Sequence, residues 1–152
     1  MALAERNKEE INMDAALAFE SLKALLGNWQ VQHDHGRISR VHYKMSCHDT
    51  VMLETWALKP DLESLTIYHM DGADFIATHY CPLGNQPRLL FTKHEDGKLK
   101  FETQSITNLI SPDHDHCRAF DFEIIDKDTI KRRETYAENG VATQESGVFT
   151  RH

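Results

Sequence analysis

The sequence predicts an all-β fold: a single antiparallel, up-and-down β-barrel of about ten strands, with an N-terminal α-helix that closes one end. Three observations predict this fold. The 152 residues leave room for one domain. Only one stretch has helical spacing of its apolar residues, and the segments after it alternate apolar and polar residues between turn signals. Short strands joined by hairpins are typical of a barrel, and a two-sheet sandwich is the alternative.

The helix is predicted over residues 12–26. Its apolar positions form one stripe, made of Ala15, Ala18, Phe19, Leu22, Leu25 and Leu26. Asn12 can cap the start, and Gly27 supplies a residue that ends helices in the left-handed conformation. We expect residues 1–11 to be disordered or extended, and residues 12–152 to form one domain.

The strands are predicted from the turn signals that separate them, such as His35-Gly36, Asp71-Gly72 and Asn139-Gly140. Their expected starts are Gly27, Arg37, Thr50, Ser64, Ala73, Gln86, Lys98, Arg118, Thr129 and Val141. One connection, from Ile106 to Cys117, is longer than a hairpin turn and is typical of a functional loop.

Charge and composition exclude several classes of partner. Asp and Glu total 24 against 17 Lys and Arg, for a formal charge of −7, which disfavours binding to nucleic acid or to anionic membranes. No apolar run reaches the roughly 18 residues of a membrane span, and the charged start, residues 1–10, lacks the apolar core of a signal peptide. We therefore expect a cytoplasmic protein in which Cys47, Cys81 and Cys117 are thiols. A homodimer through the edge at residues 147–150 requires that the barrel fail to close.

Several motifs then suggest a family. The run Leu26-Gly27-Asn28-Trp29-Gln30 and the ending Phe149-Thr150-Arg151 resemble the first and last strands of lipocalins and their calycin relatives. The runs Thr78-His79-Tyr80-Cys81 and Gly84-Asn85-Gln86-Pro87-Arg88 are similar to a family of small, functionally uncharacterised bacterial lipocalin-like proteins. The resemblance implies a barrel in which Arg151 lies across Trp29 as a structural contact, and it names no ligand.

Strand parity predicts which side chains enter the barrel. If Trp29 and Arg151 point inward, Glu145 does too, and the strand after Thr129 brings in Arg132, Glu134 and Tyr136. A buried Arg132 needs a partner, and Glu134 and Glu145 are both candidates. A register slipped by one residue is the alternative, which leaves these charges in solvent.

Two strands, residues 52–56 and 65–69, are apolar on both faces, so parity cannot orient them. We expect Glu54, Tyr68 and Tyr80 to share an inner face. His79 can lie on either face, and the stretch from Thr78 to Arg88 is the predicted rim of a binding site.

The first functional hypothesis is the binding of a small, partly apolar ligand inside the barrel. An anionic ligand is one option because the Arg88 guanidinium can bind a carboxylate or phosphate in bidentate fashion. The apolar surface is expected from Trp29, Phe75, Phe101, Phe120, Phe122 and Tyr136. The predicted ligand-binding residues are Glu54, Tyr68, His79, Tyr80, Gln86, Arg88, Arg132, Glu134 and Tyr136.

Two other hypotheses remain open. Ten histidines, among them those of His33-Asp34-His35 and His114-Asp115-His116, suggest metal or haem binding. However, no set has the compact spacing of a zinc finger, so no metal ligand and no cofactor is assigned. The second is an enzyme that uses His79, or Glu54 with a raised pKa, as a general base while Arg88 or Tyr80 polarises a substrate. No spacing commits these residues to catalysis, and binding without catalysis is favoured.

Overall fold

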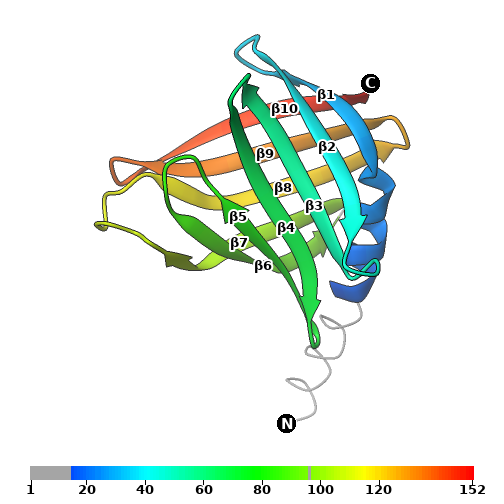
Figure 1. Cartoon of the computed structure of the whole chain (residues 1–152), viewed down its shortest axis with the longest axis horizontal. Helices are drawn as coiled ribbons and strands as arrows, with labels where there is room; N and C mark the ends of the chain where they lie inside the picture. The colour runs from blue at the N-terminus through cyan, green and yellow to red at the C-terminus, as the bar shows by residue number, and fades with distance from the viewer. Residues whose placement is uncertain (1–14, 96) are drawn as a thin grey trace.

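A computed structural model describes residues 15–95 and 97–152, which form a closed ten-stranded antiparallel barrel (Figure 1). Each strand pairs with its neighbours in sequence, and the last strand pairs with the first. The strands are β1 (Gly27–His33), β2 (Ile38–Ser46), β3 (Val51–Lys59), β4 (Leu62–Asp71), β5 (Asp74–Tyr80), β6 (Gln86–Glu95), β7 (Lys98–Thr107), β8 (His116–Asp126), β9 (Thr129–Glu138) and β10 (Val141–Arg151). Every strand begins within two residues of its predicted start. The predicted fold class is confirmed, and the sandwich alternative is wrong.

Closure of the barrel involves the edge at residues 147–150. Gly147 pairs with His33, Phe149 with Val31 and Thr150 with Gln30. Because these residues are already in the ladder between β10 and β1, the edge is not available for pairing with a second chain.

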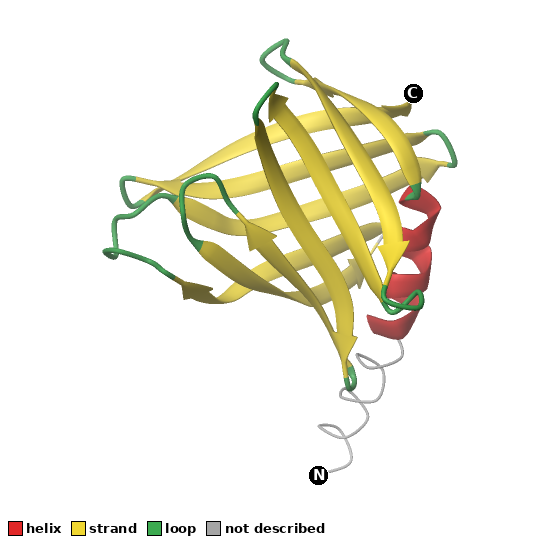
Figure 2. Ribbon diagram, viewed as in Figure 1, coloured by secondary structure: helices red, strands yellow, loops and turns green. Residues whose placement is uncertain are grey.

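The helix lies against one end of the barrel, as Figure 2 shows in red. Residues 15–22 are α-helical, and a 3₁₀ turn, η1 (Lys23–Leu25), leads into β1. The predicted stripe is buried at Ala15, Ala18, Phe19, Leu22 and Leu25. The Phe19 ring lies 5.1 Å from the Phe75 ring of β5, so the helix packs on the barrel interior. The predicted cap, Asn12, and the segment 1–11 lie outside the described residues.

The junction of helix and barrel centres on Trp29 and Arg151, which are register partners in β1 and β10. The Arg151 guanidinium lies 4.3 Å from the centre of the buried Trp29 ring. It also donates to the carbonyls of Ala24 and Leu26, at 2.6 and 2.8 Å. Arg151 therefore joins the end of the helix to both terminal strands, with its side chain still 37% exposed at the barrel rim.

The half of the interior next to the helix is filled by aromatic rings. Phe101 lies 5.1 Å from Phe75 and 5.0 Å from Phe120, measured between ring centres, and each of these rings is at most 2% exposed. The sequence suggested that a ligand lies between Trp29, Phe75, Phe101, Phe120 and Phe122. This expectation is wrong for these five rings, because they pack on one another and on the helix as a hydrophobic core.

The connections at the opposite end surround the mouth of the barrel. They are the β1–β2, β3–β4, β5–β6, β7–β8 and β9–β10 connections, the longest of which is residues 108–115 between β7 and β8 (Figure 1). These are the segments in which the sequence concentrates histidine and other polar residues. Among the described residues, no helix is long and apolar enough to cross a membrane.

Candidate functional site

A buried ionic cluster lies between the aromatic core and the mouth. Glu54 on β3 is fully buried and accepts four hydrogen bonds. Its Oε2 accepts from Arg132 Nη1 at 2.6 Å, from Tyr68 at 2.6 Å and from Tyr43 at 2.8 Å. Its Oε1 accepts from Trp56 Nε1 at 2.7 Å. This number of donors satisfies a buried carboxylate.

The cluster keeps Glu54 ionised. Burial by itself raises the pKa of this carboxyl group, but the Arg132 guanidinium and the hydroxyls of Tyr68 and Tyr43 together lower its pKa below the ordinary value. The sequence suggested Glu54 as a general base with a raised pKa. That expectation is wrong, because both oxygens of this carboxylate already accept charged or polar donors.

Arg132 joins this cluster to the mouth. Its Nη2 lies 3.0 Å from Glu134 Oε1, so Glu134 is the second carboxylate partner, as one of the two sequence alternatives had it. Its guanidinium carbon also lies 4.4 Å from the Phe120 ring centre and 4.8 Å from that of Phe122. Burial raises the pKa of Glu134 above its ordinary value, and the charges of Glu54 and Glu145 raise it further. Arg132 lowers this pKa, but by less than the other effects raise it. Glu134 therefore gains a proton more readily than an ordinary glutamate.

A pocket of about 300 Å³ opens at the mouth, on the other side of this cluster from the core. It has apolar surface from Trp56, Leu58, Pro82 and Leu83, and polar groups from strands that are distant in sequence. Its lining residues are His33, Arg37, Ser39, Trp56, Leu58, Ser64, His79, Pro82, Leu83, Asp115, Glu134, Tyr136, Glu138 and Glu145. Apolar walls with a few converging polar groups are typical of small-molecule sites.

His79 is the most unusual of the lining residues. It is only 6% exposed, and its Nδ1 lies 3.0 Å from the Thr66 hydroxyl. Its Nε2 is buried and has no hydrogen-bond partner among the described residues. Burial lowers the pKa of His79 to about 4, so the imidazole is neutral near pH 7 and Nε2 can donate or accept one hydrogen bond, according to the tautomer.

One wall of the pocket is built by two connections that are bonded to each other. In the β5–β6 turn, Asn85 is fully buried and its Nδ2 donates to the Asp115 carbonyl at 2.8 Å. Asn108 Nδ2 donates to the Gly84 carbonyl at 2.5 Å. The long 108–115 connection is therefore held against the turn that carries Pro82 and Leu83.

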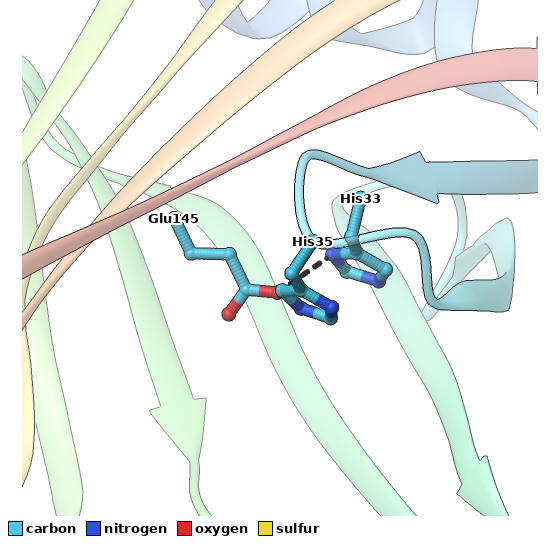
Figure 3. A group of neighbouring side chains, drawn as sticks. All are labelled: His33, His35 and Glu145. Carbon is cyan, nitrogen blue, oxygen red and sulfur yellow. Dashed lines mark hydrogen bonds and ion pairs between the residues drawn. The ribbon is translucent and has the colours of Figure 1, made fainter.

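At the rim, two histidines converge on one carboxylate (Figure 3). His33 ends β1, His35 lies in the β1–β2 turn, and Glu145 points at both from β10. Glu145 Oε1 lies 2.8 Å from His33 Nδ1 and 2.6 Å from His35 Nε2. Among the described residues, this is the group of histidine, cysteine and acidic side chains whose geometry could hold a metal ion.

The structure divides the nine predicted ligand-binding residues into two sets. Glu54, Tyr68, His79, Arg132, Glu134 and Tyr136 lie in the ionic cluster or along the pocket. Tyr80, Gln86 and Arg88 lie apart from them. Gln86 accepts a bond from the Thr107 hydroxyl at 2.7 Å, and Arg88 lies 3.2 Å from Asp71.

The expectation that Tyr80 shares a face with Glu54 and Tyr68 is wrong. Thr66 pairs with His79 and Leu65 with Tyr80, so it is His79 that follows the inner face of β5. Tyr80, the next residue, points to the opposite face and is 45% exposed.

Sequence reasoning missed Tyr43 and Trp56 as members of the site. A signal was present for both. Trp56 lies two residues after Glu54 in the same strand, so any register that brings Glu54 inward brings Trp56 with it. Tyr43 alternates with Val41 and Ser39, and in the structure it is the register partner of Glu54.

A second hollow, of about 440 Å³, lies outside the barrel on β1, β8, β9 and β10. Its charged side chains include Arg133 and Asp121, which already form an ion pair at 2.7 Å. Among its described lining residues, Arg132 has a buried nitrogen, Nε, without a partner, but the other guanidinium nitrogens of Arg132 are already held by Glu54 and Glu134 inside the barrel. The mouth pocket is therefore the better candidate for a binding site.

Comparisons with known proteins show the fold and no more. No protein-family model matches the chain, and no curated protein matches it. The crystal structure of a protein of unknown function from the DUF3598 family of Nostoc punctiforme is similar, with a TM-score of 0.58 and 10% identity over 86% of this chain and 49% of that one. The chain thus spans about half the length of that protein.

Two further solved structures are less similar. One is mFAP2b bound to DFHBI, with a TM-score of 0.44 and 10% identity over 88% of this chain and 98% of that one. The other is a redesigned β-barrel, with a TM-score of 0.38 and 11% identity over 86% and 93% of the two chains.

Proposed function

We propose that this protein binds a small, partly apolar, neutral or cationic molecule in the mouth pocket of its barrel. The observation that carries the proposal is the orphaned Nε2 of His79. A buried nitrogen without a partner costs roughly 1–3 kcal/mol, and it lines a pocket of about 300 Å³. A ligand that pairs with this nitrogen recovers that free energy on binding.

The charge of the pocket favours a neutral or cationic ligand. Four carboxylates line it, from Asp115, Glu134, Glu138 and Glu145, against one arginine, Arg37. Arg88, from which the sequence suggested an anion, is engaged elsewhere, and so is the buried Arg132. Arg88 pairs with Asp71, and Arg132 pairs with Glu54 and Glu134. The pocket therefore disfavours an anionic ligand.

The size of the pocket favours a compact ligand. A volume of about 300 Å³ is at the lower end of the range for small-molecule sites. Trp56 offers an aromatic surface, and the ionic cluster prevents the ligand from going deeper. We infer a molecule of one or two rings, with a group that reaches His79.

The proposal also includes the family and the compartment. Gly27, Trp29 and Arg151 occur in the order typical of calycin barrels, which supports a lipocalin-like protein. The three cysteines are free, and the thiol of Cys47 is exposed, which supports the reducing environment of the cytoplasm.

Three probes of equal size test the charge preference: benzamidine, a cation; benzamide, which is neutral; and benzoate, an anion. The chain contains two tryptophans, so two indole N–H signals report on binding in a nitrogen–proton NMR correlation spectrum. The Trp56 N–H bonds to Glu54 beside the pocket, and the Trp29 N–H bonds to Leu25 at the helix end. We expect benzamidine and benzamide to shift the Trp56 signal, with dissociation constants on the order of 1 mM, and to leave Trp29 in place.

Variants locate the bound probe. His79→Ala is expected to weaken benzamide binding about 5–10-fold through the lost hydrogen bond. Glu134→Gln is expected to weaken benzamidine binding selectively. Glu63→Gln, a change to an exposed acid on β4, is the matched control and is expected to change neither. Failure of all three probes to move Trp56, or a preference for benzoate, contradicts the proposal.

A further inference from the structure

The rim of the mouth holds a donor set that the ligand pocket does not require. His33, His35 and Glu145 present two imidazole nitrogens and one carboxylate oxygen, all within 4.8 Å of one another. The two imidazole rings are stacked, with centres 5.2 Å apart and an angle of 6° between their planes. Both rings direct a nitrogen at the same oxygen, Glu145 Oε1.

We infer that His33 Nδ1, His35 Nε2 and Glu145 Oε1 form a binding site for one divalent transition-metal ion of the zinc class. Two histidines with one carboxylate make up the protein ligands of one class of catalytic zinc site and of the non-haem iron facial triad. Three protein ligands leave at least one coordination position open. Because His33 and Glu145 also line the mouth pocket, that position is accessible from the pocket.

The distances fit an ion after a small adjustment. Bonds of about 2.0–2.1 Å in tetrahedral geometry place ligand atoms roughly 3.3 Å apart. Glu145 Oε1 now lies 2.8 and 2.6 Å from the two nitrogens, so the two contacts have to open by about 0.5 and 0.7 Å to reach the tetrahedral separation. The Glu145 side chain is 41% exposed and that of His35 is 50% exposed, so both can move by this amount without disturbing the core.

The outer contacts of His33 favour the metal-binding form. Its Nε2 lies 2.9 Å from the Ser39 hydroxyl. When Nε2 carries the proton and donates to Ser39, the lone pair of Nδ1 faces the ion, which is the arrangement usual for metal-bound histidines. Ser39 is itself 4% exposed, so this contact is fixed by the barrel.

His35 has to give up a hydrogen bond from the Arg37 amide in order to bind the ion. Its Nδ1 accepts a long bond of 3.4 Å from the Arg37 amide, and its Nε2 faces Glu145 at 2.6 Å. Metal binding through Nε2 places the proton on Nδ1 and gives up the Arg37 contact. The contact is at the weak end of the hydrogen-bond range, so coordination to an ion outweighs its loss.

Access to the site is open on two sides. His33 and Glu145 border the mouth pocket. His35 and Glu145 border a neighbouring hollow of about 440 Å³, together with Asp34 and Glu138. These added carboxylates make the surroundings attractive to a cation. An ion can therefore reach the three donors from solvent while the pocket is occupied.

Metal titration of the full chain, without an affinity tag and after removal of ions with EDTA, tests the inference. Calorimetry with Zn²⁺ alone is expected to give one ion per chain with a dissociation constant of 10 μM or tighter, on the order expected for three ligands. Titration with Co²⁺ is expected to produce visible absorption bands of the intensity typical of four-coordinate cobalt.

Three variants, each with a single substitution, decide where the ion binds. His35→Asn and Glu145→Gln are each expected to weaken Zn²⁺ binding at least 10-fold and to abolish the cobalt bands. His48→Asn is the matched control: His48 is exposed in the β2–β3 turn at the other end of the barrel and has φ of 54°, which asparagine tolerates. Circular dichroism and urea unfolding verify that each variant is folded.

Two outcomes overturn the inference: no stoichiometric binding of Zn²⁺ or Co²⁺, or binding that His35→Asn and Glu145→Gln leave unchanged. Neither outcome affects the proposed pocket, since the test uses the metal alone. The benzamide series uses metal-free protein, so the two proposals fail or succeed separately.

Discussion

Arg132 on β9 reaches across the barrel to Glu54 on β3, and Arg132 Nη1 lies 2.6 Å from Glu54 Oε2. Both side chains are at most 3% exposed. The pair lies between the packed phenylalanines and the mouth pocket, so it forms the inner limit of the space that a ligand can enter.

Replacement of Arg132 by glutamine is expected to lower the free energy of unfolding by about 3–5 kcal/mol. The change leaves Glu54 buried with its charge no longer compensated. The matched control is Arg133→Gln, one residue along the same strand, where the side chain is 49% exposed and pairs with Asp121. There we expect a loss of at most about 1 kcal/mol. Urea unfolding measures both, and similar losses in the two variants argue against a buried ion pair.

His79 is expected to make the protein less stable in acid. The pKa of His79 is about 4 in the folded protein and near 6.5 in the unfolded chain. A folded-state pKa below the unfolded value means that the unfolded chain binds the proton first. The stability that neutral His79 contributes is therefore fully present above pH 6.5 and is lost as the pH falls toward 4. By pH 4.5 the loss in the free energy of unfolding is roughly 2–3 kcal/mol.

The variant His79→Gln removes this titration while keeping a polar side chain in place. Urea unfolding at pH 7.0, 5.5 and 4.5 gives the loss of stability for each protein, and other titrating groups contribute equally to both. We expect the loss between pH 7.0 and 4.5 to be smaller in the variant by roughly 2–3 kcal/mol. Equal losses are inconsistent with a buried neutral His79.

Arg151 is expected to stabilise the helix end of the barrel. Arg151→Ala removes the contact with Trp29 and the bonds to the carbonyls of Ala24 and Leu26. We expect a loss of roughly 2 kcal/mol in thermal or urea unfolding. Thr150→Ala, at the neighbouring exposed position of β10, serves as the control with an expected change below about 0.5 kcal/mol. A loss in Thr150→Ala as large as that in Arg151→Ala is the result that counts against this role.

Asn85 is expected to control the mobility of the mouth. Asn85→Ala breaks the bond from its side chain to the Asp115 carbonyl, at a cost of roughly 1–2 kcal/mol. Hydrogen exchange is expected to quicken at residues 81–85 and 108–116, since the two connections are no longer held together. The β8–β9 turn, residues 127–128, lies at the other end of the barrel and provides the internal control. Faster exchange at both ends indicates general destabilisation instead.

Most of the fold follows from local signals in the sequence. The two-residue alternation and the turn dipeptides locate all ten strands of the described chain, because each hairpin is specified by residues that are adjacent in sequence. An even number of antiparallel strands brings the last beside the first, which places Arg151 opposite Trp29. The start of the helix lies outside the described residues.

The site was harder to predict, for a physical reason. Where one face of a strand is apolar and the other polar, as around Ile130 and Arg132, parity identifies the inner residues correctly. The strands that carry Glu54 and Tyr68 are apolar on both faces, so their orientation depends on pairing with distant residues such as Arg132. Tyr80 was misplaced because β5 has buried residues on both faces near Ile76 and Ala77.

The Glu54–Arg132 pair also limits how the barrel can evolve. Loss of either residue alone leaves the other charge uncompensated in a low-dielectric interior. Loss of both still leaves the buried donors of Tyr43, Tyr68 and Trp56 without the carboxylate that they share. Enlargement of the ligand space toward the helix therefore requires coupled substitutions at Glu54, at Arg132 and among these donors. Related barrels that accept larger molecules are expected to differ at both positions at once, so the depth of the binding chamber should change between lineages in a single step.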